Sequence, residues 1–277
     1  MSNKDNLCEC TSPQPQNAKT WCNDNICICG FPTKNDFELN KIYNENCLDT
    51  MKRMPDDFVD MVVTSPPYNI GKSRANTNNP DLVYDTYSDD LEIQEYFKQT
   101  KIWLDELLRV SKHYVFWNIG EYAGCKGIAG FIMNTYKENL KENFIWIKPN
   151  PNPVGRNIVC NSYEYIFCLV KENADKRKYD YNNFGDNMIK NYIIKPVNNN
   201  KDNGGHGYAF GEWLPKYFIH NFSKEGDTIY DCFMGSGTTA VAAHVLDRKF
   251  IGSEISEKYV GIANNRLKPY LTQIKLF

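Results

Sequence analysis

The fold is decided by residues 228–240, TIYDCFMGSGTTA, in which an apolar run leads through an acidic residue and two glycines into threonines. The first three residues favour a strand, and Thr238 and Thr239 are typical of a helix start. Glycines at such a turn let a ligand approach the backbone at the helix N-terminus. Glu254 follows the next predicted strand, where its carboxylate can accept hydrogen bonds from two ribose hydroxyls. The pattern G-x-G-x-x-A therefore predicts a nucleotide-binding turn.

Strands and helices alternate around this turn. Strands are predicted over residues 58–64, 114–119, 144–147, 163–170, 228–230 and 250–252, and helices over 93–108, 238–246 and 258–267. This alternation is typical of an α/β fold with a doubly wound, mostly parallel sheet. Only about forty residues follow the glycine turn, which is room for one more strand and helix. Most of the sheet must therefore come from the sequence before the turn.

The composition excludes several classes of protein. With 277 residues, of which 42% are hydrophobic and 14% aromatic, the chain suits a globular fold and not a fibrous or disordered one. It contains no apolar run of about 18 residues and no signal-peptide pattern, so we expect no membrane partner and a cytoplasmic location. In that reducing compartment the ten cysteines are expected to be thiols.

Residues 1–35 form a cysteine-rich segment that stands apart from the main domain, which is expected over residues 36–277. Five of the ten cysteines lie here: Cys8, Cys10, Cys22, Cys27 and Cys29. A zinc ion held by Cys8, Cys10, Cys27 and Cys29 would order such a segment, although these spacings depart from the usual gaps between zinc ligands. A flexible cysteine-rich tail is the alternative.

A second motif, Ser65-Pro66-Pro67-Tyr68-Asn69, follows the strand predicted over residues 58–64. Two prolines cannot continue a β-ladder, so they fix a rigid backbone at the carboxyl end of the strand, where open α/β sheets bind ligands. The serine adds a hydroxyl, the first proline a carbonyl and the tyrosine a ring. Alone, the motif would also suit a proline-rich strand terminator.

Together, the two motifs resemble those of the S-adenosylmethionine-dependent DNA amino-methyltransferases, and their order resembles the β group of that family. The resemblance extends from about Lys41 to Leu267. It implies a methyltransferase sheet that is circularly permuted, with the catalytic motif N-terminal and the cofactor motif C-terminal. It also implies S-adenosylmethionine as cofactor and double-stranded DNA as partner.

The resemblance assigns roles to individual residues. Those implied in catalysis are Ser65, Pro66, Pro67 and Tyr68, and those implied in cofactor binding are Asn46, Cys47, Asp231, Phe233, Gly235, Ser236, Gly237, Thr238, Thr239 and Glu254. Asn46 stands where the family usually carries aspartate. Trp146, Lys148 and Glu164 fall where the family has its tryptophan-x-lysine and a later glutamate.

The motif chemistry suits methylation of an exocyclic base amine, whose lone pair is delocalised into the ring. If the Ser65 hydroxyl and the Pro66 carbonyl accept hydrogen bonds from both N–H groups, the lone pair is localised for attack on the sulfonium methyl. The base must be flipped out of the duplex, and Tyr68 is expected to stack on it. Serine at position 65 is the family's common choice for cytosine-N4, which favours that amine over adenine-N6.

Three other functions compete with this interpretation. A dinucleotide-dependent oxidoreductase would explain the glycine turn and leave the proline motif unexplained. A non-catalytic nucleic-acid-binding module would retain the fold without the intact motifs. RNA or glutamine methyltransferases share the proline-proline-tyrosine element but usually place the glycine motif first. Cytosine-C5 methylation is disfavoured, because it typically needs a cysteine after proline and the chain has no Pro-Cys dipeptide.

An insertion at about residues 172–205 is expected to read the DNA target. Eight asparagines lie between positions 182 and 203, a composition that favours turns and loops. Residues 171–201 carry seven basic and four acidic side chains, a net charge of +3. The expected DNA contacts are Lys176, Arg177, Lys178 and Lys190. A cognate restriction endonuclease and a second copy of the chain are further candidate partners, and association with the nucleoid through DNA is expected.

Overall fold

A computed structural model describes residues 37–71, 87, 89–151, 159–172, 174–197 and 211–272. It also describes the backbone of β1 (Cys22–Asn23) and β2 (Ile26–Cys27), which pair antiparallel. No helix in these ranges is long and apolar enough to cross a membrane.

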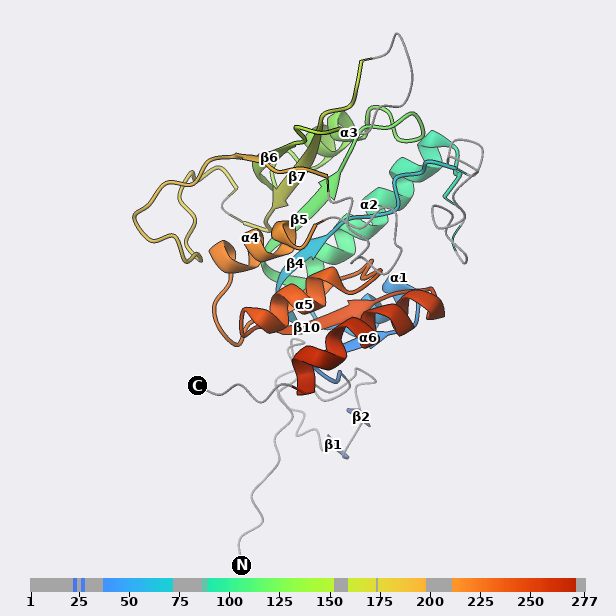
Figure 1. Ribbon diagram of the computed structural model, residues 1–277, viewed down its shortest axis with the longest axis vertical. Helices are drawn as coiled ribbons and strands as arrows, with labels where there is room; N and C mark the ends of the chain where they lie inside the picture. The colour runs from blue at the N-terminus through green and yellow to red at the C-terminus, as the bar shows by residue number, and fades with distance from the viewer. Residues whose placement is uncertain are drawn as a thin grey trace, which may run out of the picture.

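A sheet of eight strands forms the centre of the molecule, in the order β3-β10-β9-β4-β5-β7-β6-β8 (Figure 1). Their bounds, in that order, are Lys41–Tyr43, Lys249–Ser253, Thr228–Asp231, Val59–Thr64, Ser111–Ile119, Tyr163–Leu169, Leu140–Ile147 and Tyr192–Ile194. The first five strands in this order, β3, β10, β9, β4 and β5, are mutually parallel. Strand β7 runs antiparallel to both β5 and β6.

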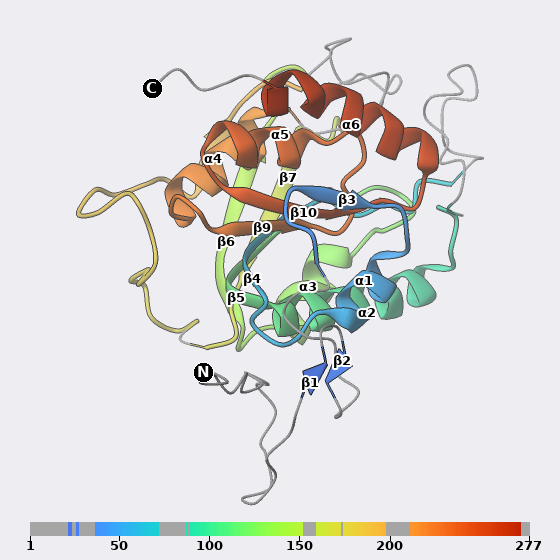
Figure 2. The ribbon, with the colours of Figure 1, turned by 90° about the horizontal axis from the view of Figure 1, so that it is seen from below.

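Helices cover both faces of the sheet, as Figure 2 shows. One face carries α1 (Cys47–Arg53), α2 (Ile93–Val110) and α3 (Ile128–Thr135), and the other carries α4 (Trp213–Phe222), α5 (Thr238–Val245) and α6 (Glu257–Thr272). Two separate apolar cores result. The first includes Trp103 and Leu107 of α2, and the second includes Phe218 of α4 and Ala240 of α5.

The fold class is confirmed as a doubly wound α/β sheet that is mostly parallel. The six strands predicted from the sequence correspond to β4, β5, β6, β7, β9 and β10. The short helices α1, α3 and α4 were not predicted, and β8 lies inside the insertion whose composition favoured turns and loops. There the run Tyr192–Ile194 is apolar enough to pair with β6.

The sheet brings the two motifs together at its switch point. Strands β9 and β4 are hydrogen-bonded neighbours with parallel register, Met61 opposite Ile229. Helix α5 follows β9 and leads to one side of the sheet, while α2 follows β4 and leads to the other side. The carboxyl ends of both strands therefore open into the crevice where doubly wound folds bind ligands.

Candidate active site

One cavity is lined by both motifs. The turn at Ser65 to Tyr68, named the catalytic turn after its predicted role, contributes Ser65, Pro66, Pro67 and Tyr68. The glycine turn contributes Phe233, Gly235, Ser236 and Thr238. The walls are completed by Glu45, Asn46, Cys47 and Leu48 at the start of α1, by Gln99 and Trp103 of α2, and by Glu254 and Ile255 after β10. The cavity thus joins the two sequence motifs, which stand about 160 residues apart.

Glu254 holds the glycine turn in shape. Its carboxylate accepts one hydrogen bond from the Gly235 backbone N–H at 2.8 Å and another from the Ser256 N–H at 2.8 Å. Gly235 and Gly237 have φ of 52° and 83°, in the left-handed region that favours glycine. A Cβ on Gly237 would lie only 2.8 Å from the Cβ of Ala263, so a side chain there would force α5 away from α6.

Asp231 links the glycine turn to the catalytic turn. Its buried carboxylate accepts hydrogen bonds from the Thr64 hydroxyl at 2.6 Å, the Thr239 hydroxyl at 2.5 Å and the Phe233 N–H at 3.0 Å. Burial raises the pKa of Asp231 to about 6, and these three hydrogen bonds oppose the rise. Thr64 directly precedes Ser65, so Asp231 fixes the spacing of the two turns.

The structure divides the predicted cofactor residues into two groups. Asp231, Gly237 and Thr239 do not line the cavity; they lie behind it and shape its wall. The other seven predicted cofactor residues do line it. The G-x-G-x-x-A pattern could not separate the two groups, because it marks a turn and not the direction of each side chain.

The start of α1 forms a further wall of the cavity. Asn46 is the N-cap of this helix, and its side-chain oxygen accepts from the Leu48 N–H at 2.9 Å. Cys47 is buried at the next position and also lines the cavity. Asn46 is exposed, and the cap hydrogen bond fixes the orientation of its side-chain amide.

The catalytic turn is held by groups from three directions. The Tyr96 hydroxyl of α2 donates to the Pro67 carbonyl at 2.6 Å. Asn69 has a φ of 54°, and its amide donates to the carbonyls of Leu91 and Gly124, both at 2.8 Å. Asp89 accepts from the Asn69 N–H at 2.6 Å. The backbone that carries the serine and the first proline is therefore preorganised.

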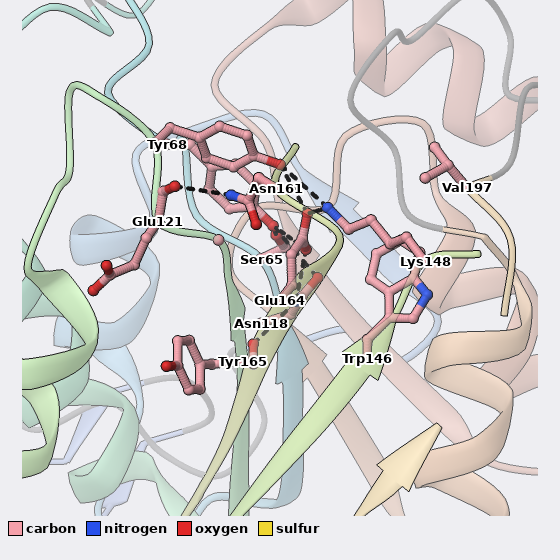
Figure 3. Close-up of polar contacts among 12 residues, drawn as sticks. Ser65, Tyr68, Asn118, Glu121, Trp146, Lys148, Asn161, Glu164, Tyr165 and Val197 are labelled. Atoms are coloured by element: carbon pink, nitrogen blue, oxygen red, sulfur yellow. Dashed lines mark hydrogen bonds and ion pairs between the residues drawn. The ribbon is translucent and has the colours of Figure 1, made fainter. Parts of the chain in front are cut away.

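A buried polar network lies behind the turn, and Figure 3 shows its side chains pointing toward one another. The Tyr68 hydroxyl lies 2.9 Å from Ser65 Oγ and 3.0 Å from Glu164 Oε2. Glu164 Oε1 lies 2.5 Å from Lys148 Nζ, and only 6% of each of these two side chains is exposed. The Tyr68 ring stacks on Tyr122, with ring centroids 5.4 Å apart.

Sequence reasoning missed Asn118 and Tyr122 in this network. Asn118 Nδ2 donates to Glu164 Oε2 at 2.9 Å, and the Tyr122 hydroxyl donates to Glu164 Oε1 at 3.0 Å. A signal existed for Asn118, because it is a polar residue near the end of the otherwise apolar run Tyr114–Ile119 of β5. Tyr122 lies in a loop beyond that strand and carries no comparable signal.

The predicted basic DNA contacts do not gather at the cavity. Because β7 is antiparallel to β5, it ends at the edge opposite the catalytic turn, and Lys176, Arg177 and Lys178 follow that end in the sequence. Lys190 precedes β8, which runs parallel to β6 toward the cavity edge. The contact of these residues with DNA stays a prediction.

Of the predicted zinc ligands, Cys8, Cys10 and Cys29 lie outside the described residues, and only the backbone of Cys27 is described. Within the described ranges, no group of three His, Cys, Asp or Glu side chains is placed to hold a metal ion. Cys47, Cys125, Cys160, Cys168 and Cys232 are in the reduced thiol form.

Comparisons with known proteins agree with this geometry. The profile of a DNA methylase family, N6_N4_Mtase, matches residues 59–265. The type II methyltransferase M.HinfI of Haemophilus influenzae is 30% identical over 251 residues, which cover 84% of this chain and 69% of that protein. The orphan methyltransferase M.BamHII of Bacillus amyloliquefaciens is 31% identical over 262 residues, covering 78% and 91%. The chain therefore belongs to this family of DNA methylases.

Within the methylases, it is an S-adenosylmethionine-dependent DNA amino-methyltransferase of the N4/N6 group. Solved structures share its fold. PvuII DNA methyltransferase (cytosine-N4-specific) has a TM-score of 0.63 at 18% identity, over 86% of this chain and 87% of that one. The M1.HpyAVI–SAM complex has a TM-score of 0.56 at 21% identity, over 82% and 98%.

Proposed function

We propose that the enzyme transfers the methyl group of S-adenosylmethionine to the N4 amine of a cytosine flipped out of double-stranded DNA. The observation that carries the proposal is one shared cavity, which Ser65 and the glycine turn both line. A methyl donor on the turn and an amine at the serine would then meet without further movement of the protein.

The cavity fits the cofactor by its chemistry. Glu254 offers carboxylate oxygens for two ribose hydroxyls, and the turn at Gly235 and Ser236 approaches the methionine end. Leu48 and Ile255 supply apolar surface for the adenine ring. A Thermus thermophilus protein solved as a complex with S-adenosyl-L-methionine has the same fold, with a TM-score of 0.57 at 18% identity. When bound, the cofactor supplies an electrophilic methyl group.

The catalytic turn would act on the base. Ser65 Oγ and the Pro66 carbonyl accept one hydrogen bond each from the amine, which localises the nitrogen lone pair toward the methyl group. Burial and the nearby charge of Glu164 raise the pKa of Tyr68 well above its ordinary value, so the phenol keeps its proton. Its ring, already stacked on Tyr122, offers the flipped base a flat apolar surface.

The choice of amine rests on Ser65. A serine hydroxyl is shorter and neutral compared with the side chain of aspartate, and the family commonly pairs serine with cytosine-N4. Adenine-N6 is the alternative product. Incubating the enzyme with S-adenosylmethionine and DNA that lacks both modifications, then digesting the DNA to nucleosides, should give N4-methylcytosine by mass spectrometry. N6-methyladenine as the sole product would overturn the choice of base and leave amine methylation standing.

DNA is expected to lie over the cavity edge of the sheet. The exposed residues Lys190 and Lys195 flank β8, whose last residues pair with the end of β6 at that edge. Replacing both with glutamine should weaken DNA binding and lower the slope of log affinity against log salt by about 0.9 for each phosphate that the protein no longer neutralises.

The matched comparison is a triple glutamine variant of Lys176, Arg177 and Lys178, at the opposite edge. Its salt slope should equal that of the unaltered enzyme in fluorescence-anisotropy titrations. A lowered slope for this triple variant alone would support the DNA surface inferred from the sequence and would contradict the placement over the cavity edge.

The protein partners and the metal content of the enzyme are proposed from the family and from the cysteine pattern. The named relatives include a type II methyltransferase and an orphan methyltransferase. A cognate restriction endonuclease and a homodimer are therefore proposed only from membership of the family. Zinc on the N-terminal cysteines rests on the cysteine pattern, and a four-thiolate site would give about one equivalent in elemental analysis. Residues 172–205 are proposed to contribute to recognition of the DNA target. The enzyme is proposed to be located with the cellular DNA on which it acts.

A further inference from the structure

The Tyr68 hydroxyl has three polar neighbours, and two of them can only accept. Glu164 Oε2 lies at 3.0 Å and Asn118 Oδ1 at 3.4 Å, while Ser65 Oγ lies at 2.9 Å. A phenol has one proton to donate. Because carboxylate and amide oxygens offer no proton to the phenol, the Tyr68 proton is directed to that side of the ring.

The orientation of the Asn118 amide is fixed independently. Its Nδ2 lies 3.1 Å from the backbone carbonyl of Tyr165, which only accepts, so this end of the amide must be the NH₂ group. The same NH₂ donates to Glu164 at 2.9 Å. Glu164 is also paired with the Lys148 ammonium, which only donates. Every neighbour of the carboxylate therefore treats it as an acceptor.

The hydrogen bond between Ser65 and Tyr68 then has one possible direction. Since the phenol gives its proton to Glu164 or Asn118, the serine must donate its own proton to the Tyr68 oxygen. We propose that Glu164, acting through Tyr68, orients the Ser65 hydroxyl so that its lone pairs face the cavity and accept from the target amine. Glu164 is therefore a positioning residue. The proposal rests on the proposed function, which identifies the target amine as the group that donates to Ser65.

The direction matters because a hydroxyl can either donate or accept. If the Ser65 proton pointed into the cavity, it would meet the N–H groups of the amine, and the hydrogen bond that localises the lone pair could not form. The substitution Glu164→Gln retains the shape but brings an NH₂ group into the network. Lys148 requires the amide oxygen on its side, so the NH₂ faces Tyr68. The acceptors left for the phenol proton are Ser65 Oγ at 2.9 Å and Asn118 Oδ1 at 3.4 Å, and the nearer one is Ser65.

We expect Glu164→Gln to lower kcat for DNA methylation about 100-fold while changing the cofactor Kd less than twofold. Tyr68→Phe removes the phenol, so Glu164→Gln added to it should lower kcat by less than about threefold further. Independent, multiplicative effects of the two substitutions would overturn the proposal. The matched control is Glu121→Gln, a nearby exposed carboxylate outside the network, which should retain wild-type kcat.

Loss of the buried partner of Lys148 threatens folding, so two further measurements keep the test decisive. Tyr68→Phe leaves the ion pair intact and should by itself lower kcat at unchanged melting temperature; an unchanged kcat would contradict the proposal. Neutron diffraction from deuterated crystals should place the Ser65 deuteron toward Tyr68 and the Tyr68 deuteron toward Glu164 or Asn118. A Ser65 deuteron that points into the cavity would overturn the proposal. Because this measurement needs no turnover, a wrong hydrogen-bond direction and a failed methylation assay are separate results.

Discussion

Ser65→Ala should lower kcat for DNA methylation by about 10² to 10³-fold and leave the affinity for S-adenosylmethionine unchanged, because loss of one preorganised hydrogen-bonding group at a reacting centre has effects of this size. The serine lies on a backbone fixed by Asp231 through Thr64, so truncating its side chain should not move the turn. Single-turnover methyl transfer measures the rate, and isothermal titration calorimetry measures the cofactor affinity.

Ser162→Ala is a matched control, since Ser162 directly precedes β7 near the same edge of the sheet but does not line the cavity. It should retain wild-type kcat. A kcat for Ser65→Ala within threefold of wild type would remove the serine from the reacting centre. Equal losses of kcat and cofactor affinity would point instead to a collapsed turn.

Glu254→Ala should raise the Kd for S-adenosylmethionine about 10- to 100-fold. The carboxylate accepts hydrogen bonds from the backbone N–H groups of Gly235 and Ser256. Glu254 also lines the cavity where the ribose hydroxyls are proposed to bind. Each ribose hydroxyl that is buried on binding without its acceptor costs about 1–3 kcal/mol, which is enough to account for the expected rise in Kd.

Glu257→Ala is the control for this variant, because Glu257 is an exposed carboxylate three residues later at the start of α6. Calorimetry should give it a Kd within about twofold of wild type, as a single exposed first-turn carboxylate contributes only a few tenths of a kcal/mol to its helix. An unchanged Kd for Glu254→Ala would show that the cofactor does not depend on this carboxylate.

The positions of the two motifs could be predicted from the sequence because both are local. Residues 228–240 and Ser65 to Tyr68 each combine a strand with residues that stop it, and the parallel α/β pattern puts such strand ends at one edge. The structure adds what joins them. Asp231 contacts Thr64 across 167 residues of sequence, and no local pattern reports a contact of that range.

The network behind Tyr68 was predictable only in part. Lys148 and Glu164 fall at positions that the resemblance marks, but their pairing depends on β6 and β7 lying side by side and antiparallel. The placement of the basic residues could not be predicted either. The charge pattern predicts a DNA surface at Lys176 to Lys178, but it does not encode the direction of β7, which sets the edge of the sheet that they occupy.

The most direct test of the shared cavity is a crystal structure of the enzyme with S-adenosylmethionine. The account predicts that the methionine end lies against Gly235 and Ser236, that the ribose hydroxyls contact Glu254, and that the sulfonium methyl points toward Ser65 and the Pro66 carbonyl. A cofactor bound outside this cavity, or bound within it with its methyl group directed away from Ser65, would contradict the account.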